Sequence, residues 1–209
     1  MQVDIWSDIV CPWCSIGQAR FEKALIAYDG PVTVRLHPFR LDPSAPVPGE
    51  PAAERYRRKF GDESETMLAR VTAAGEEDGL AFRFDRAVTG NTFDAHRAIG
   101  YADRSGRGRA LERALFTAYF TDGRDISDRS VIADAAASVG EDRAVVAAYL
   151  ESDAGEAELA RELEEASALG ITSVPTFVFN RQFAVPGAVD AATFAKIFEQ
   201  MRAMPEEPG

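Results

Sequence analysis

The chain has 209 residues, 46% of them hydrophobic and 27% charged, which is the balance of a folded globular protein and excludes a disordered one. Its formal net charge of −11 repels polyphosphates and anionic lipids, so we expect no nucleic acid and no membrane among its partners. There is no apolar run of about 18 residues, and the first residues include Asp4 and Asp8 instead of the basic and apolar parts of a secretory signal. We therefore expect a cytoplasmic protein.

The first segments of the chain predict a βαβ unit. Residues 3–7, rich in β-branched and aromatic side chains, predict a strand that leads into Cys11. Residues 13–28 have apolar side chains at helical spacing and are followed by Asp29-Gly30-Pro31, which ends a helix. Residues 32–37 alternate apolar and polar side chains, which indicates a second strand, parallel to the first.

The middle of the chain predicts a helical insertion. Residues 41–51 contain four prolines, Pro43, Pro46, Pro48 and Pro51, which are incompatible with a helix or a central strand, so we place a domain boundary there. The chain from 52 to 169 is rich in Ala, Leu, Glu and Arg. It predicts helices over 66–78, 92–103, 110–120, 130–139, 143–150 and 156–169, the last ended by Gly170.

The last segments predict a hairpin and a helix. Residues 175–180 and 181–185 predict two strands joined by a tight turn near Asn180 and Arg181, which add an antiparallel edge to the sheet. Asp190 can cap a helix over 191–204, and 205–209 form a flexible tail. The order predicts an α/β fold in which residues 1–45 and 169–204 form one domain, interrupted by an all-helical domain over 46–168.

The only two cysteines lie in one tetrapeptide, Cys11-Pro12-Trp13-Cys14, whereas a structural disulfide normally joins distant segments. One helical turn brings the two sulfur atoms to the same face, within reach of a disulfide. Free N–H groups and the positive end of the helix dipole stabilise a thiolate at Cys11, which we predict to be the nucleophile. Pro12 suits the first helical position, where its missing N–H costs no hydrogen bond. Trp13 is uncharged, so it cannot stabilise the Cys11 thiolate by charge attraction.

A second signal is Val174-Pro175, which follows Gly170 and opens a predicted strand. Proline has no ladder hydrogen bond to lose there, and a cis bond would expose the backbone edge of Val174. Such an edge can pair with an extended peptide. We therefore expect Val174 and Pro175 to lie beside the cysteines and hold a substrate backbone there.

With these motifs the chain resembles the FrnE-like branch of the DsbA family of disulfide oxidoreductases over nearly its whole length. The resemblance implies a thioredoxin-like fold carrying the helical insertion, a nucleophilic Cys11, a resolving Cys14 and a cis-proline. It also implies that no metal or cofactor is bound, and that partners are protein or small-molecule thiols and disulfides, with a low-molecular-weight thiol available as co-substrate. The matching residues are Ile5-Trp6-Ser7-Asp8, the cysteine motif, Ile16-Gly17, Pro38-Phe39, Leu41-Asp42-Pro43, Asn91-Thr92, Ala95-His96-Arg97, Leu115-Phe116, Ala118-Tyr119-Phe120, Gly170-Ile171, Val174-Pro175 and Phe177.

Two positions depart from the family. Ser15 stands where these proteins often have tyrosine, and Pro186-Gly187-Ala188 replaces the usual Ser-Gly-Ala, so we expect an altered substrate surface around an intact redox centre. No acid stands clearly at the position of the buried carboxylate of thioredoxin. Asp4 and Asp8 are the nearest candidates.

Other interpretations stay open. Relatives of kappa-type glutathione transferases and hydroxychromene-carboxylate isomerases share this architecture, but a second cysteine would have no task in their reactions. A redox-switched holdase or binding protein is another alternative. A zinc site with His37 and His96 is disfavoured, because these residues lack paired metal-ligand spacing. We interpret both histidines as packing residues, the pairs Phe177 with Phe179 and Phe116 with Phe120 as core, and the acidic run 162–165 as a solvated helix face.

Overall fold

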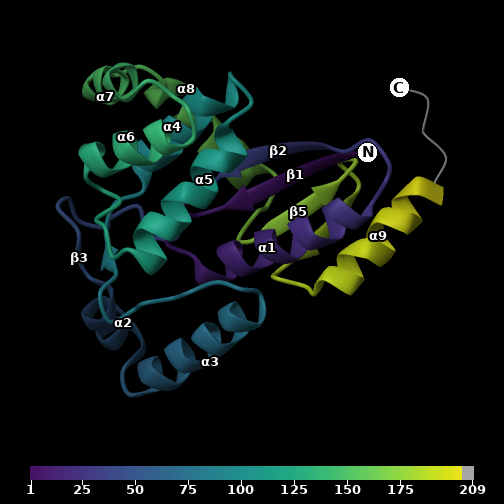
Figure 1. Cartoon of the computed structure of the whole chain (residues 1–209), viewed down its shortest axis with the longest axis horizontal. Helices are drawn as coiled ribbons and strands as arrows, with labels where there is room; N and C mark the ends of the chain where they lie inside the picture. Colours follow the sequence, from purple (N-terminus) through teal and green to yellow (C-terminus); the bar gives the residue numbers. More distant parts are fainter. Residues whose placement is uncertain (204–209) are drawn as a thin grey trace.

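The computed structural model describes residues 1–203, in which a four-stranded mixed sheet unites the two ends of the chain (Figure 1). The strand order is β2-β1-β5-β6. The first two strands are parallel, and β5 runs antiparallel to both of its neighbours, so the predicted parallel pair and hairpin edge are both confirmed. The strands are β1 (Gln2–Ser7), β2 (Thr33–Pro38), β5 (Thr176–Phe179) and β6 (Phe183–Pro186).

Helices α1 (Pro12–Ala27) and α9 (Ala191–Ala203) pack against each other over this sheet. The core between them is aromatic: the ring of Phe177 lies 5.5 Å from that of Phe21 and 4.7 Å from that of Phe194. Asp190 caps α9, since its Oδ1 accepts a hydrogen bond of 2.7 Å from the Thr193 N–H. The predicted helix end at 204 and the predicted tail 205–209 lie outside the described residues.

The chain between β2 and β5 forms a block of helices, as expected. None of the helices within residues 1–203 has both the length and the apolar character needed to cross a bilayer. The elements of the block are α2 (Ala52–Phe60), α3 (Glu63–Glu77), α4 (Phe93–Asp103), α5 (Gly108–Phe116), the π-helical segment η1 (Thr117–Thr121), α6 (Arg129–Ser138), α7 (Arg143–Glu151) and α8 (Glu156–Ala168).

The block departs from the expectation in three places. Helix α2 was not predicted, because its composition is highly charged and only Tyr56 and Phe60 mark its apolar side. The helix expected over 110–120 ends as an α-helix at Phe116 and continues as the π-helical η1. The block is also not all-helical, since β3 (Glu50–Pro51) pairs with β4 (Val88–Thr89) in a small second sheet.

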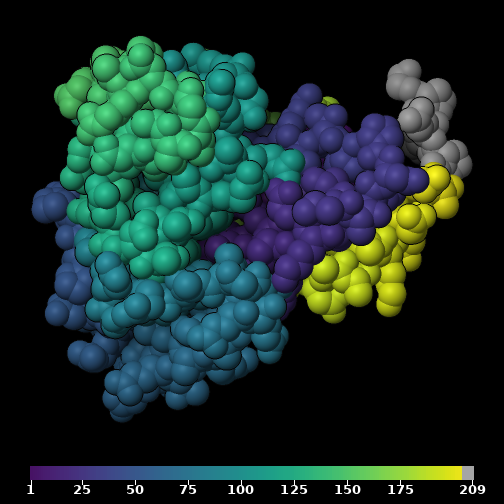
Figure 2. All heavy atoms as spheres, viewed as in Figure 1, coloured from purple at the N-terminus to yellow at the C-terminus, as the bar shows by residue number. Residues whose placement is uncertain are grey.

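The cysteine motif lies where the sheet meets the helical block. The helical block has its own buried core, to which Ile9, Cys11 and Cys14 from the sheet unit contribute. On the face shown in Figure 2, α1 lies beside the teal helices of the block, with a hollow of about 160 Å³ lined by α1, α5 and the segment after α3. The first turn of α1 is therefore enclosed by both parts of the chain.

Candidate active site

Cys11 and Cys14 are placed by the start of α1. Cys11 is the N-cap residue, with an extended backbone at φ −91° and ψ 109°, and Pro12 occupies the first helical turn. The Cys14 N–H donates a hydrogen bond of 3.0 Å to the Cys11 carbonyl, which closes the turn between them. Both residues are free thiols, Cys11 4% exposed and Cys14 completely buried. The first cysteine thus lies at the surface of the site and the second beneath it.

The surroundings of Cys14 oppose its ionisation. Burial raises the pKa of the Cys14 thiol well above its ordinary value, and the hydrogen bond and charge of the neighbouring Cys11 raise it further. The Asp8 backbone and the Ser7 side chain oppose this shift without cancelling it. At neutral pH Cys14 is therefore a protonated thiol, and it must lose its proton before it can attack a disulfide.

The Val174–Pro175 segment reaches the cysteines from the other end of the chain. The peptide bond between them is cis, as is that between Val47 and Pro48. The Cys11 Sγ lies 3.7 Å from the Val174 carbonyl oxygen, to which the thiol donates. Gly17 permits this approach, because a Cβ at that position would come within 3.0 Å of the Pro175 ring. The structure thus brings together the residues that the sequence singled out from both ends of the chain.

Cys11 opens into a groove of about 300 Å³. Trp13, 39% exposed, stands at its edge, and Val174 forms part of its wall. The opposite wall comes largely from α2 and α3, which contribute apolar side chains and the cations Arg55 and Lys59. Arg55 is neutralised by ion pairs with Asp42 and Glu50. The remaining apolar lining residues include Leu41, Tyr56, Phe60, Met67, Leu68 and Val71.

The two histidines each face a buried carboxylate. His96 Nε2 lies 3.2 Å from Asp8 Oδ1, while the other oxygen of Asp8 accepts the Leu41 N–H at 2.8 Å. His37 Nε2 lies 2.9 Å from Asp4 Oδ1. Asp4 and Asp8, the two candidate buried acids, therefore each have a histidine partner, as buried polar groups in a folded protein require. Within residues 1–203, no group of three or more His, Cys, Asp or Glu is arranged to hold a metal ion.

One buried acid near the cysteines was not predicted from the sequence. Glu112 of α5 is 2% exposed, and its Oε2 has no hydrogen-bond donor. Burial raises the pKa of this carboxyl, although the Ser7 and Gln18 side chains beside it favour the charged form. The available signal was its position on the apolar face of α5, four residues before the buried Phe116.

Comparison with known proteins gives this arrangement a family context. Residues 2–199 match the family described as DSBA-like thioredoxin domain. A solved structure, the probable DsbA oxidoreductase SCO1869 from Streptomyces coelicolor, superposes with a TM-score of 0.91 at 36% identity, covering 100% of this chain and 93% of that one. The YwbO protein of Bacillus subtilis is 28% identical over 201 residues, 94% of each chain. The cytosolic disulfide reductase DsbM of Pseudomonas aeruginosa, solved with GSH, shares the fold with a TM-score of 0.67 at 19% identity, covering 98% of this chain and 100% of that one.

Proposed function

The chain belongs to the DSBA-like thioredoxin domain family, and from this premise we propose that it is a thiol-disulfide oxidoreductase in which Cys11 attacks and Cys14 resolves. The observation that carries the proposal is the contact between Cys11 Sγ and the Val174 carbonyl at the mouth of the groove. At this contact the more exposed thiol of Cys11, the N-terminus of α1 and the backbone edge of Val174 lie together. Cys14, fully buried one turn inside, suits the second step.

The exchange proceeds in two displacements. The Cys11 thiolate attacks one sulfur of a substrate disulfide, forms a mixed disulfide and releases the other sulfur as a thiolate. Cys14 then attacks Cys11 Sγ, and the Cys11–Cys14 bond forms while the bond to the substrate breaks. The protein dithiol is oxidised and the substrate disulfide is reduced. In the opposite direction the same steps oxidise a substrate dithiol.

The lining of the groove suits a substrate that is bound through its backbone and through apolar contacts. We infer that Val174 and Pro175 present the edge that pairs with the substrate, with Trp13 and the α2 wall on either side. Partners of this kind are protein or small-molecule thiols and disulfides. The glutathione-bound structure of the relative DsbM supports a low-molecular-weight thiol as co-substrate, and its cytosolic description supports a cytoplasmic location for this chain.

Trapping of the mixed disulfide tests the assignment. Cys14→Ser should accumulate covalent complexes in cells, because only a neighbouring thiol at high effective concentration releases the substrate quickly. Cys11→Ser, the matched control, should trap few or none, since it lacks the attacking sulfur. The complexes are separated without reductant and identified by mass spectrometry.

Two other results would replace this function. Glutathione conjugation or isomerase activity that persists when neither variant traps a partner would favour the transferase or isomerase alternative. Undiminished protection of unfolded clients by a variant lacking both cysteines would favour the holdase.

A further inference from the structure

The charged side chains that line the groove at the active site are not all paired. Asp8 is buried and lies against His96, with 3.2 Å between Oδ1 and Nε2. Arg55 and Asp42 form an ion pair with each other. Lys59 is the fourth charged lining residue, and no carboxylate within residues 1–203 forms an ion pair with it. The groove therefore presents one positive charge that the protein itself does not neutralise.

The ammonium group of Lys59 is held at the wall of the groove. Lys59 lies in the last turn of α2, where the negative end of the helix dipole favours a cation. Its Nζ lies 5.4 Å from the centroid of the Phe60 ring, a cation–π contact, and that ring is 39% exposed and lines the same groove. A carboxylate that enters the groove thus meets an ammonium group whose position is already restricted, and with it can form a charge-assisted hydrogen bond.

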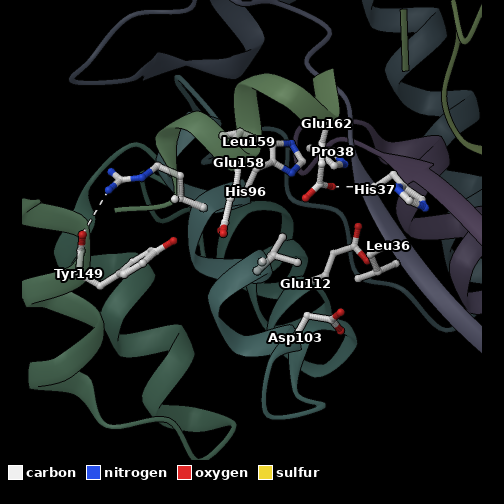
Figure 3. Close-up of a pocket in the computed structure, with 14 residues that line it drawn as sticks. Leu36, His37, Pro38, His96, Asp103, Glu112, Tyr149, Glu158, Leu159 and Glu162 are labelled. Carbon is white, nitrogen blue, oxygen red and sulfur yellow. Dashed lines mark hydrogen bonds and ion pairs between the residues drawn. The ribbon is translucent and has the colours of Figure 1, made fainter. Parts of the chain in front are cut away.

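A second hollow of the molecule has the opposite charge. It is a polar cavity of about 130 Å³ between β2, α4, α5 and α8, and Figure 3 shows the carboxyl groups of Asp103, Glu112, Glu158 and Glu162 around it. It shares no lining residue with the groove. The chain as a whole has a formal charge of −11 and repels anions, but salt screens this repulsion over about 8–10 Å. A substrate carboxylate is therefore favoured close to Lys59 and not in the acidic cavity.

We propose that Lys59 is a specificity-determining residue, which selects protein substrates that carry an acidic side chain close to the reacting cysteine. This inference rests on the proposed function and adds a substrate class to it. The substrate sulfur reaches Cys11, its backbone lies along Val174, and its carboxylate pairs with the ammonium group of Lys59. All three residues line the same groove.

The apolar walls of the groove favour a peptide over a small acidic thiol. Beside Lys59, helices α2 and α3 contribute the side chains of Tyr56, Phe60, Leu68 and Val71. A small thiol acid has no apolar side chains with which to cover this surface. A peptide segment supplies them next to its carboxylate, so burial of apolar surface adds to the ion pair.

Three peptides that differ only in having Glu, Gln or Lys beside their single cysteine test the proposal. Each is supplied as a mixed disulfide with thiopyridine, an uncharged leaving group whose release changes the absorbance. The Cys11 thiolate attacks the peptide sulfur, the bond to thiopyridine breaks, and the released thiopyridine takes up a proton from solvent. Cys14 then attacks Cys11 Sγ and releases the peptide thiolate. Stopped-flow absorbance of the reduced full-length protein gives the second-order rate constant of the first displacement.

The wild type should react about 2- to 5-fold faster with the Glu peptide than with the Gln peptide, the effect of a partly exposed ion pair. Lys59→Gln should remove this preference, and Lys59→Glu should reverse it in favour of the Lys peptide. The ratio of the rate constants is the readout, because an effect of Lys59 on the reactivity of Cys11 itself is common to all three peptides and cancels. The wild-type preference should shrink in about 1 M salt, which screens the charges.

Lys196→Gln is the matched control. It makes the same change of charge at an exposed position of α9, outside the groove, and should keep the wild-type ratio. An equal ratio of Glu to Gln peptide in wild type and Lys59→Gln overturns the inference. So does slower oxidation of Lys59→Gln by glutathione disulfide without a change in the peptide ratio, which would assign the lysine to a small acidic thiol. If Cys11→Ser releases thiopyridine as fast as the wild type, the proposed function fails instead.

Discussion

At the scale of single residues, most side chains of the site can be recognised from the sequence, but one cannot. The cysteine motif is visible because two reactive residues stand together, and Val174-Pro175 because a proline opens a strand. No comparable sequence pattern points to Glu112. Acids on helices are usually solvated, and only the packing of α5 against the site makes this one buried. Burial of a helical acid is a tertiary property that spacing does not encode.

Glu112 should cost stability at neutral pH. Its folded-state pKa is raised by burial, so the native state holds the proton more tightly than the unfolded state. Stability is then greatest below the unfolded pKa and falls as pH rises through the folded pKa. Glu112→Gln removes this loss and should raise the melting temperature by about 2–4 °C at pH 7. The difference should vanish near pH 4, as thermal unfolding at both pH values will show. A lower melting temperature at pH 7 would contradict this.

At the scale of elements, regular apolar spacing predicted most helices to within a few residues. Helix α2 was not predicted because Arg55, Arg57, Arg58 and Lys59 dominate its composition, and its two large apolar side chains, Tyr56 and Phe60, line the groove. The change from α5 to the π-helical η1 also escaped. It widens the backbone turn without altering the apolar pattern of Phe116 and Phe120, which are both buried.

An ion-pair cluster joins α1 to the end of α3. Asp78 Oδ2 lies 2.6 Å from Arg20 Nε, and its Oδ1 lies 2.7 Å from Lys23 Nζ. Arg20 also donates to the Ala188 carbonyl at 2.8 Å, near the Val174–Pro175 segment. Burial opposes ionisation of Asp78, but Lys23 and Arg20 outweigh it and hold the pKa of that carboxyl below its ordinary value.

Asp78→Asn should therefore destabilise the protein in a pH-dependent manner. A lowered folded-state pKa gives stability that is present above the unfolded pKa and is lost as pH falls through the folded value. At pH 7 we expect a loss of about 1 kcal/mol in the free energy of unfolding, because solvent screens the half-exposed Lys23. Urea unfolding at pH 7 and near pH 3 measures it. Asp85→Asn, which breaks an exposed pair with Arg83, is the control and should change stability little. A deficit unchanged at low pH would refute the linkage.

At the scale of the whole molecule, the order of segments predicted the interrupted architecture, but not how closely its two parts depend on each other. We propose the division into a thioredoxin-like domain of residues 1–45 and 169–204 and an insertion over 46–168. The sheet core and the helical core are distinct clusters, which supports the division. Yet Ile9, Cys11, Cys14 and Ile16 belong to the helical core, and Leu36 packs against both. Periodicity shows which residues are buried, not which partner buries them.

Removal of the insertion should therefore prevent folding of the remainder. A variant with residues 46–168 replaced by a short Gly/Ser linker would expose the first turn of α1, including the fully buried Ile16 and Cys14. We expect no cooperative thermal transition by circular dichroism and no dispersed amide spectrum by NMR. A cooperative transition with dispersed resonances would show that the thioredoxin-like part folds alone.

The pairing of β3 with β4 has a consequence for how such proteins diversify. Residues 52–87 leave the fold after β3 and return before β4, and the pairing of Glu50 with Thr89 closes their base. Within this closed excursion lie α2 and α3, which supply most of one wall of the groove, while the cysteines lie outside it. A segment whose two ends pair with each other can be replaced by a different one without changing the path of the rest of the chain. Substrate preference can thus diverge among relatives through 52–87 while the redox chemistry is inherited intact.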